Sequence, residues 1–221
     1  MIKTFSSRAG RLSDTNKKFL ELQSTCLIKH ETKPQTKLPI VIDIGFGDAQ
    51  SFTKDVVNNK NHCFIGIEPY KKGFARAVEF YEKENPKNLY LYNGDAREFL
   101  EAIEYKASFV RIHFPDPWPK KKHIKRRLIS LSFLHLLNQK ILETGKIEII
   151  TDSKTYQNHI EDVLKEQKLF KQIDNFEISS LCIPPVISNE SKFCILAPFI
   201  SVFKLSPIHN IFLLFISAAI S

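Results

Sequence analysis

The sequence predicts an α/β fold in which a mostly parallel sheet is covered by helices on both faces. Two observations favour this class. Short apolar segments alternate along the chain with longer segments that carry apolar residues at helical spacing, as is typical of βαβ units. Several of the apolar segments also end at a glycine or an acidic residue. The chain has 221 residues, most simply one domain with enough residues for a substantial core.

The predicted elements follow one another from residue 38 to residue 180. Strands are expected where apolar, β-branched and aromatic residues cluster, at 38–44, 62–67, 88–93, 108–114, 146–150 and 176–180. Helices are expected at 49–57, 71–84, 127–142 and 156–167. In the second of these helices, apolar residues recur at helical spacing, namely Phe74, Ala77, Val78 and Tyr81. Residues 1–38 are polar and basic, and we expect an arm with a short helix near 19–27.

Acidic residues lie at or shortly after the ends of five predicted strands: Asp43, Glu68, Asp95, Asp116 and Asp152. A single acid at such a position is usually a solvated surface residue. Ligands of parallel α/β sheets, however, bind beyond the carboxyl ends of the strands, and these ends meet at one edge of the sheet. We therefore expect the five acids to form the rim of one site.

A short glycine motif, Gly45-Phe46-Gly47, follows the first predicted strand. It suits a tight turn that lets a ligand approach the backbone closely. Glu68 follows about 20 residues later at the next strand end, where an acid typically accepts hydrogen bonds from ribose hydroxyls. The third glycine of the dinucleotide fingerprint is missing, which disfavours a pyrophosphate cradle. A nucleoside cofactor without phosphates fits better, and S-adenosylmethionine is the obvious candidate.

Three further residues complete the predicted cofactor pocket. Asp95 is expected to accept a hydrogen bond from the adenine amino group, with Ala96 beside it. Asp43 is expected to face the cationic methionine end of the cofactor. The alternative for Asp43 is a half-buried acid that accepts hydrogen bonds from neighbouring backbone amides.

The segment from Phe114 to Arg127 carries one carboxylate in a proline-rich loop, followed by an indole and a dense basic block. The prolines fix φ, so the loop loses little entropy in staying rigid. Asp116 can accept hydrogen bonds from the edge of a nucleobase, and Trp118 can stack on the base or wall its pocket. The six Lys and Arg residues from Lys120 to Arg127 can bind phosphates. The alternative is a structural turn followed by a solvated, basic start of a helix.

The charge of the chain indicates a polyanionic partner. The formal net charge is +8 and the pI is about 9.2, with positive charge concentrated beside Asp116, which favours nucleic acid over a membrane. The four cysteines form no CxxC pair or Cys/His cluster, which argues against a zinc site, and we expect no metal. The first residues are polar and basic rather than a secretory signal, so we expect a cytoplasmic protein with free thiols.

Together these segments resemble the bacterial tRNA (guanine-N7)-methyltransferases. The resemblance extends from Arg8 to Pro185, and its most specific part is the Asp-Pro-Trp segment with its basic continuation. The other matching segments are 8–11, 43–47, 66–68, 93–96 and 151–152, the last together with Tyr156. The resemblance implies a Rossmann-like fold of the class I S-adenosylmethionine-dependent methyltransferases. It also implies methyl transfer from S-adenosylmethionine to N7 of a guanine in the tRNA variable loop.

The resemblance further implies roles for individual residues. Glu68, Asp95 and Asp116 would contact the cofactor, and Asp116 would also be the catalytic residue. Asp43 stands where the family usually has Glu, and its shorter side chain would reach less far. The residues implied to contact the tRNA are Lys120, Lys122, His123, Lys125, Arg126, Arg127 and Asp152.

The C-terminal segment departs from this family. We expect a basic arm at 1–38, a methyltransferase domain at 39–187 and a divergent hydrophobic tail at 188–221. The family usually continues past its Pro-Pro region into a Thr-x-Phe/Tyr-Glu motif, which residues 188–192 do not reproduce. From residue 193 to residue 221, the only formally charged side chain is that of Lys204.

Three interpretations of this tail stay open. It is a divergent last strand with an extra hydrophobic segment packed on the sheet, a membrane-associated end, or a frame-shifted or eroded gene end. The apolar character is interrupted by Lys204, Pro207, His209 and Asn210, and 211–220 is too short to span a bilayer, which needs about 20 apolar residues. We therefore expect no stable association with a membrane.

Other functions also fit parts of the pattern. One is an amino-group methyltransferase acting on nucleic acid, because Pro-Asp-Pro-Trp resembles loops that hold an exocyclic amine beside a methyl donor. Another is a catalytically impaired homologue that binds tRNA without turnover. A nicotinamide-dependent oxidoreductase fits less well, since the fingerprint glycine is missing.

Overall fold

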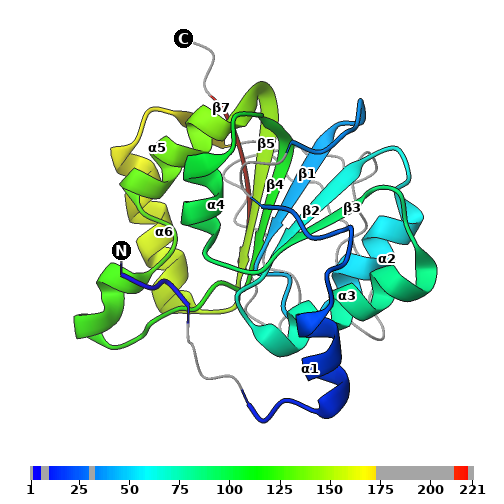
Figure 1. Cartoon of the computed structure of the whole chain (residues 1–221). Coiled ribbons are helices and arrows are strands. Elements are labelled where there is room, and N and C mark those ends of the chain that lie inside the picture. Colours follow the sequence, from blue (N-terminus) through cyan, green and yellow to red (C-terminus); the bar gives the residue numbers. More distant parts are fainter. Residues whose placement is uncertain (1, 6–9, 30–32, 173–211, 219–221) are drawn as a thin grey trace, which may run out of the picture.

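The computed structural model describes residues 2–5, 10–29, 33–172 and 212–218, and the described part is built around a seven-stranded sheet (Figure 1). The strands are β1 (Ile40–Ile44), β2 (Cys63–Ile67), β3 (Leu89–Tyr92), β4 (Ala107–His113), β5 (Ile141–Thr151), β6 (Phe170–Gln172) and β7 (Phe212–Ala218). Their order in the sheet is β3-β2-β1-β4-β5-β7-β6. Strands β1 to β5 pair in parallel, whereas β7 is antiparallel to both of its neighbours.

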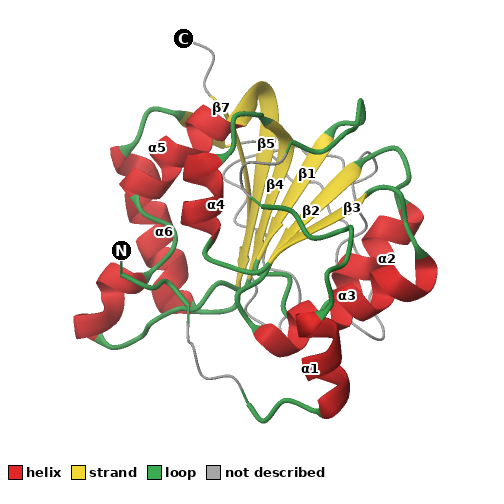
Figure 2. Cartoon of the chain, in the orientation of Figure 1, coloured by secondary structure: helices red, strands yellow, loops and turns green. Residues whose placement is uncertain are grey.

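Helices cover both faces of this sheet (Figure 2). They are α1 (Asp14–Glu21), α2 (Gln50–Asn58), α3 (Lys71–Glu84), α4 (Ala96–Ala102), the 3₁₀ helix η1 (Lys121–Arg126), α5 (Leu131–Lys140) and α6 (Lys154–Glu166). Helices α2 and α3 pack on one face around Phe52 and Val78, and α1 packs on α3. Helices α4, α5 and α6 pack on the other face around Phe99 and Ile160.

The alternating strands and helices confirm the predicted α/β class. All residues of β2 and all but the first of β1 are buried, which explains why the two strands are continuous apolar segments with few polar residues. Helix α3 has the predicted bounds, and Asn85 in the left-handed conformation ends it. The cores on the two faces of the sheet therefore fix the carboxyl ends of the strands relative to one another.

Several elements differ from the sequence prediction. No helix is predicted where α4 lies, because seven residues are too few for a clear helical period. The helix predicted at 127–142 begins only at Leu131, where Ser130 accepts the capping hydrogen bond from the Phe133 N–H. Helix α1 begins at Asp14, earlier than predicted, because Ser13 caps it. The strand predicted at 176–180 lies outside the described residues.

The C-terminal strand β7 lies inside the sheet, between β5 and β6. Its pairing with β5 extends from Lys146↔Ser217 to Thr151↔Phe212. For these seven residues, the placement corresponds to the interpretation of the tail as a last strand, and it joins them to the sheet of the domain predicted at 39–187. The rest of the predicted tail lies outside the described residues. Within the described ranges, no helix is long and apolar enough to cross a membrane.

Candidate active site

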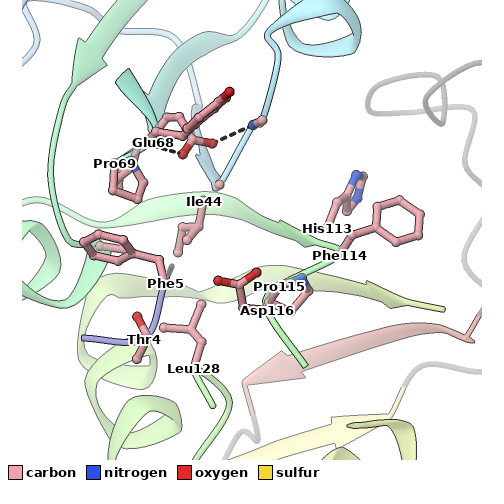
Figure 3. A pocket seen from close by; sticks show the side chains of 15 residues that line it. Thr4, Phe5, Ile44, Glu68, Pro69, His113, Phe114, Pro115, Asp116 and Leu128 are labelled. Atoms are coloured by element: carbon pink, nitrogen blue, oxygen red, sulfur yellow. Dashed lines mark hydrogen bonds between the residues drawn. The ribbon is translucent and has the colours of Figure 1, made fainter. Parts of the chain in front are cut away.

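A cavity of about 360 Å³ lies at the carboxyl ends of β1, β2 and β4 (Figure 3). This volume is within the range of small-ligand sites, about 300–1,000 Å³. The predicted site residues that line it are Gly45, Gly47, Glu68, Ala96 and Asp116. Its other lining residues are Thr4, Phe5, Ile44, Ile67, Pro69, Tyr70, His113, Phe114, Pro115 and Leu128. Glu68 and Asp116 lie on opposite sides of Ile44 in the close-up view.

The turn after β1 forms one wall of the cavity and depends on its glycines. Gly45 and Gly47 have φ angles of 76° and 66°, which side chains rarely adopt. Helix α3 packs closely on this turn at Gly73. A Cβ atom there would lie only 1.6 Å from the carbonyl oxygen of Gly47, so only glycine leaves room for the contact. The predicted glycine turn is therefore present, and a third glycine, one helix further along the chain, fixes its position.

Glu68 connects this turn to the end of β2. Its carboxylate accepts hydrogen bonds from the backbone N–H of Gly47 at 2.6 Å and of Tyr70 at 2.7 Å. The side-chain amide of Asn93 donates to the carbonyl oxygen of Glu68 at 2.7 Å and so aligns the ends of β2 and β3. Burial raises the pKa of Glu68 to about 7, although the two backbone hydrogen bonds act in the opposite direction. The carboxylate thus lies at the cavity wall with a pKa near 7. A ligand that donates hydrogen bonds to it would lower this pKa.

Asp43 is not among the residues that line the cavity. It accepts hydrogen bonds from Arg111 of β4, including one from Nε at 3.0 Å, and Arg111 also pairs with Asp55 of α2. All three side chains are buried. Burial alone would lower the pKa of Arg111, but the two carboxylates raise it above its ordinary value. This ion triad fixes the end of β1, directly before the glycine turn, to β4 and α2.

Asp95 also has an arginine partner. Its Oδ1 accepts hydrogen bonds from the backbone N–H of Arg97 at 2.9 Å and from Nε of Arg97 at 3.1 Å, and its Oδ2 accepts one from Nη2 at 2.7 Å. Asp95 therefore caps α4 and is mostly buried, while the neighbouring Ala96 lines the cavity.

The opposite wall is the loop from Phe114 to Trp118, which contains Asp116. Phe114 and Trp118, the first and last residues of this loop, have positive φ angles of 48° and 42°. Such angles are unusual for bulky residues and indicate local strain, which occurs most often at functional sites. The Phe114 N–H donates to the carbonyl oxygen of Ile150 at 2.8 Å, which ties the start of the loop to β5.

The N-terminal arm reaches this loop from outside the predicted site. The indole Nε1 of Trp118 donates to the carbonyl oxygen of Thr4 at 2.8 Å, and Arg126 stacks on the indole with its guanidinium carbon 3.6 Å from the ring centroid. Arg126 also donates to the carbonyl oxygens of Lys3 and Phe5. Because these contacts involve backbone carbonyls far away in the sequence, no local pattern indicated that Thr4 and Phe5 would line the cavity.

The basic block divides into exposed and engaged side chains. Most of it forms the 3₁₀ helix η1, which precedes the helix predicted at 127–142 and was not itself predicted. The exposed members are Lys120, Lys121, Lys122 and Lys125, whereas His123 and Arg126 are half-buried and Arg127 is buried. Asp152 is exposed directly after β5 and does not line the cavity.

One further polar pair was not foreseen. His113, the last residue of β4, lines the cavity and pairs with Glu148 of β5. A periodicity of two along β4 places Arg111 and His113 on one face of the sheet, which is the signal that could have indicated a polar cluster there. Among the described residues, no group of three His, Cys, Asp or Glu side chains is arranged to hold a metal ion.

Comparison with known proteins identifies the family. The profile of a family described as "Putative methyltransferase" matches residues 37–193. A tRNA (guanine-N(7)-)-methyltransferase of Wolbachia pipientis is 37% identical over 174 residues, which cover 77% of this chain and 79% of the relative. The chain belongs to the tRNA (guanine-N(7)-)-methyltransferase family. A relative with the same name from Neorickettsia sennetsu is 32% identical over 178 residues, which cover 80% of each chain.

Solved structures agree with the fold of this tRNA (guanine-N(7)-)-methyltransferase family member. A 30S ribosomal A1408 methyltransferase from an uncultured bacterium has a TM-score of 0.51 and 20% identity, covering 82% of this chain and 88% of that one. "A putative methyltransferase from Streptococcus mutans in complex with SAH" has a TM-score of 0.51 and 13% identity, covering 83% and 90%. At these identities the likeness concerns the fold alone. The predicted family and the Rossmann-like class I methyltransferase fold are therefore confirmed.

Proposed function

We propose that this chain transfers a methyl group from S-adenosylmethionine to N7 of a guanine in the variable loop of tRNA. The observation that carries the proposal is the cavity with Glu68 on one wall and Asp116 on the other, at the carboxyl ends of the parallel strands. Exposed lysines follow Asp116 within nine residues, from Lys120 to Lys125. Membership of the family supports both the methyl donor and the tRNA substrate.

The cavity fits a nucleoside cofactor. A Cβ atom on Gly45 or Gly47 would meet no protein atom within 4 Å, so the backbone of the turn is open to a ligand. Glu68 accepts hydrogen bonds from the ribose hydroxyls, and Ala96 lies beside the adenine ring. Asp95 keeps the start of α4 in place next to the adenine. There its carboxylate can accept a hydrogen bond from the adenine amino group. Asp43 acts on the methionine end through the Arg111 triad, which sets the position of the turn.

S-adenosylmethionine supplies a methyl group on a positively charged sulfur. Guanine N7 carries an in-plane lone pair and no proton at neutral pH, so the protein needs no general base to expose it. Asp116 accepts hydrogen bonds from the guanine N1–H and amino group and stabilises the positive charge that the ring gains. The rigid loop around Asp116 holds N7 in line with the methyl group, which is a proximity effect.

The tRNA binds next to this cavity. Lys120, Lys122 and Lys125 are exposed and hold phosphates, and His123 and Arg126 border them. Asp152 meets the substrate at the exit of β5. Phosphate contacts discriminate little between sequences, so the shape of the tRNA selects the guanine. A tRNA substrate agrees with the cytoplasmic location expected from the sequence.

Methyl transfer from labelled S-adenosylmethionine to unmodified tRNA tests the proposal. The full-length chain should yield N7-methylguanine as the labelled base, and mapping of the product should locate it in the variable loop. Label on an exocyclic amine would instead indicate an amino-group methyltransferase. Binding of the cofactor and tRNA without transfer would indicate a catalytically impaired homologue.

A further inference from the structure

Arg127 ends the basic block but differs from the rest of it in burial. Arg127 is 7% exposed, whereas Lys125, two residues earlier, is an exposed residue. Its Nε donates to the carbonyl oxygen of Pro117 at 2.8 Å, and its Nη1 donates to that of Thr155 at 3.3 Å. Its guanidinium also lies over the ring of Tyr156, 5.2 Å from the ring centroid. These contacts turn the guanidinium towards the protein.

The loop that Arg127 contacts has fewer backbone donors than most loops with which to fix itself. Pro115 and Pro117 have no N–H, and the residues before and after this Pro-Asp-Pro segment have strained, positive φ angles. Strained backbone keeps its conformation only where the surrounding structure holds it. The Pro117 carbonyl belongs to the residue directly after Asp116, so a donor fixed there restrains the backbone that carries the carboxylate of Asp116.

The other end of the Arg127 contact is rigid. Thr155 lies in the first turn of α6, where the side chain of Ser153 accepts the capping hydrogen bond from the Tyr156 N–H. Tyr156 is fully buried, and its hydroxyl accepts a hydrogen bond from the N–H of Ile129 at 3.0 Å. Arg127 therefore connects the strained loop to a fixed point of the core.

We propose that Arg127 is a positioning residue for Asp116 and does not bind a tRNA phosphate. The inference rests on the proposed function, because the position of Asp116 matters only if Asp116 stabilises the methylated base. A phosphate ligand has to present its charge to the solvent, where the RNA backbone approaches. Arg127 instead uses its charge and planar fork to hold two carbonyl oxygens at once, which a lysine cannot reproduce.

The decisive comparison is Arg127→Lys against Lys125→Gln. Arg127→Lys keeps the positive charge but loses the two-point contact. We expect the single-turnover rate at saturating tRNA to fall about ten- to hundredfold, since small misplacements of reacting groups cost up to about a hundredfold. The slope of log Kd for tRNA against log salt should stay as in the wild type. Lys125→Gln, at a residue proposed to hold a phosphate, should instead reduce the magnitude of this slope by about 0.7–0.9.

Opposite results would overturn the proposal. A wild-type rate for Arg127→Lys would show that the two-point contact is dispensable. A salt slope reduced by Arg127→Gln as much as by Lys125→Gln would make Arg127 a phosphate ligand. A double variant, Arg127→Lys with Pro117→Gly, should be no slower than the slower single variant, because both act on the same loop. Fully multiplicative losses would contradict a shared route through Pro117.

A second measurement requires no variant. In the wild-type protein, phenylglyoxal labelling read by mass spectrometry should leave Arg127 unmodified with and without unmodified tRNA. Rapid labelling of Arg127 that tRNA suppresses would overturn the inference, even if Arg127→Lys did not fold. Failure of the proposed function would be seen separately, as absence of methyl transfer by the wild-type chain, whereas the labelling and the salt slopes still decide whether Arg127 meets phosphate.

Discussion

The two walls of the cavity are built in opposite ways. The wall around Gly45, Gly47 and Glu68 consists of a glycine turn between regular elements, held by backbone hydrogen bonds to one carboxylate. The wall around Asp116 is a loop with two prolines and strained bulky residues, and the contacts that hold it include side-chain donors from Trp118 and later residues. The first wall depends on glycines that the turn itself requires. The second depends on hydrogen bonds between residues that lie apart in the sequence, such as Trp118 with Thr4.

Under the proposed function, this difference corresponds to a division of roles between the wall around Gly45, Gly47 and Glu68, here the cofactor wall, and the wall around Asp116, here the loop wall. A cofactor that binds through backbone and one carboxylate needs a wall of fixed shape, which close packing on α3 provides. A carboxylate that has to meet a base in one orientation needs a loop whose direction is set by specific contacts, at the cost of strain. The acids follow the same division. Glu68 and Asp116 line the cavity, whereas Asp43 and Asp95 pair with arginines and support the cofactor wall.

The largest effect should come from the loop wall, at Asp116. Asp116→Ala removes the carboxylate proposed to stabilise the positive charge on guanine, and loss of such a group typically lowers a rate by about 10²–10³-fold. Binding of tRNA should change little, because the lysines that hold phosphates remain. Single-turnover rates and tRNA affinities measure the two quantities. Asp162→Ala, at an exposed position of α6, is the matched control and should behave as the wild type.

A rate for Asp116→Ala within a few-fold of the wild type would remove the assigned role from this residue. The proposed difference in function between the cofactor wall and the loop wall would then have no support from Asp116. A comparable loss in both rate and tRNA affinity would instead indicate that the loop as a whole had been displaced.

The next effect should come from the cofactor wall, at Gly73. A Cβ atom there would lie 1.6 Å from the carbonyl oxygen of Gly47, so Gly73→Ala forces α3 and the turn apart. Overpacking of this kind costs about 1–3 kcal/mol of unfolding free energy, and we expect the upper end because the clash is with backbone. Cofactor affinity should fall as well. Denaturant unfolding and calorimetric titration measure both, and Lys71→Ala, exposed on the same helix, should change neither.

If Gly73→Ala lowered stability but left cofactor affinity intact, the turn would not need its present position to bind the cofactor. A fixed shape of the cofactor wall would then not be what cofactor binding requires.

The same comparison explains what the sequence predicts and what it does not. The glycine turn and Glu68 follow from signals within about 20 residues, namely a strand, two glycines and an acid at the next strand end. The Asp-Pro-Trp loop is equally visible, because prolines, acid and indole are adjacent in the chain. The strand positions also follow largely from the alternation of elements: β1 to β4 lie where apolar segments predict them, and β5 contains the predicted strand but begins earlier, at Ile141.

The partners of these residues could not be read in the same way. Asp43 and Arg111 are 68 residues apart and meet only because β1 and β4 pair in parallel. Trp118 and Thr4 are 114 residues apart, and the contact uses a backbone carbonyl that every residue possesses. Arg127 belongs to a charge run in the sequence, and only tertiary contacts separate it from its exposed neighbours.

The smallest expected effect links the two walls through the proton on Glu68. Its pKa lies near 7 in the folded chain, raised mainly by burial, with Asp43 and Asp116 adding smaller contributions in the same direction. Because folding raises the pKa of Glu68 from 4.5 to about 7, the folded chain binds the proton more tightly than the unfolded chain. The free energy of unfolding therefore falls as pH rises from 4.5 towards 7, by at most about 1.4 kcal/mol per pH unit. Ribose hydroxyls that donate to Glu68 favour its ionised form, so cofactor binding should release a proton.

Cofactor affinity should therefore rise with pH up to about 7, by at most about tenfold per unit, and then level off. Calorimetric titrations at pH 6, 7 and 8, in buffers of different ionisation enthalpy, measure both the affinity and the released proton. Glu68→Gln should remove this part of the pH dependence, while titration of the cofactor itself is common to both proteins. Identical pH profiles for wild type and variant would exclude Glu68 as the group that the ribose meets. A profile shifted to lower pH in Asp116→Ala would show that the carboxylate of the loop wall acts on the cofactor wall.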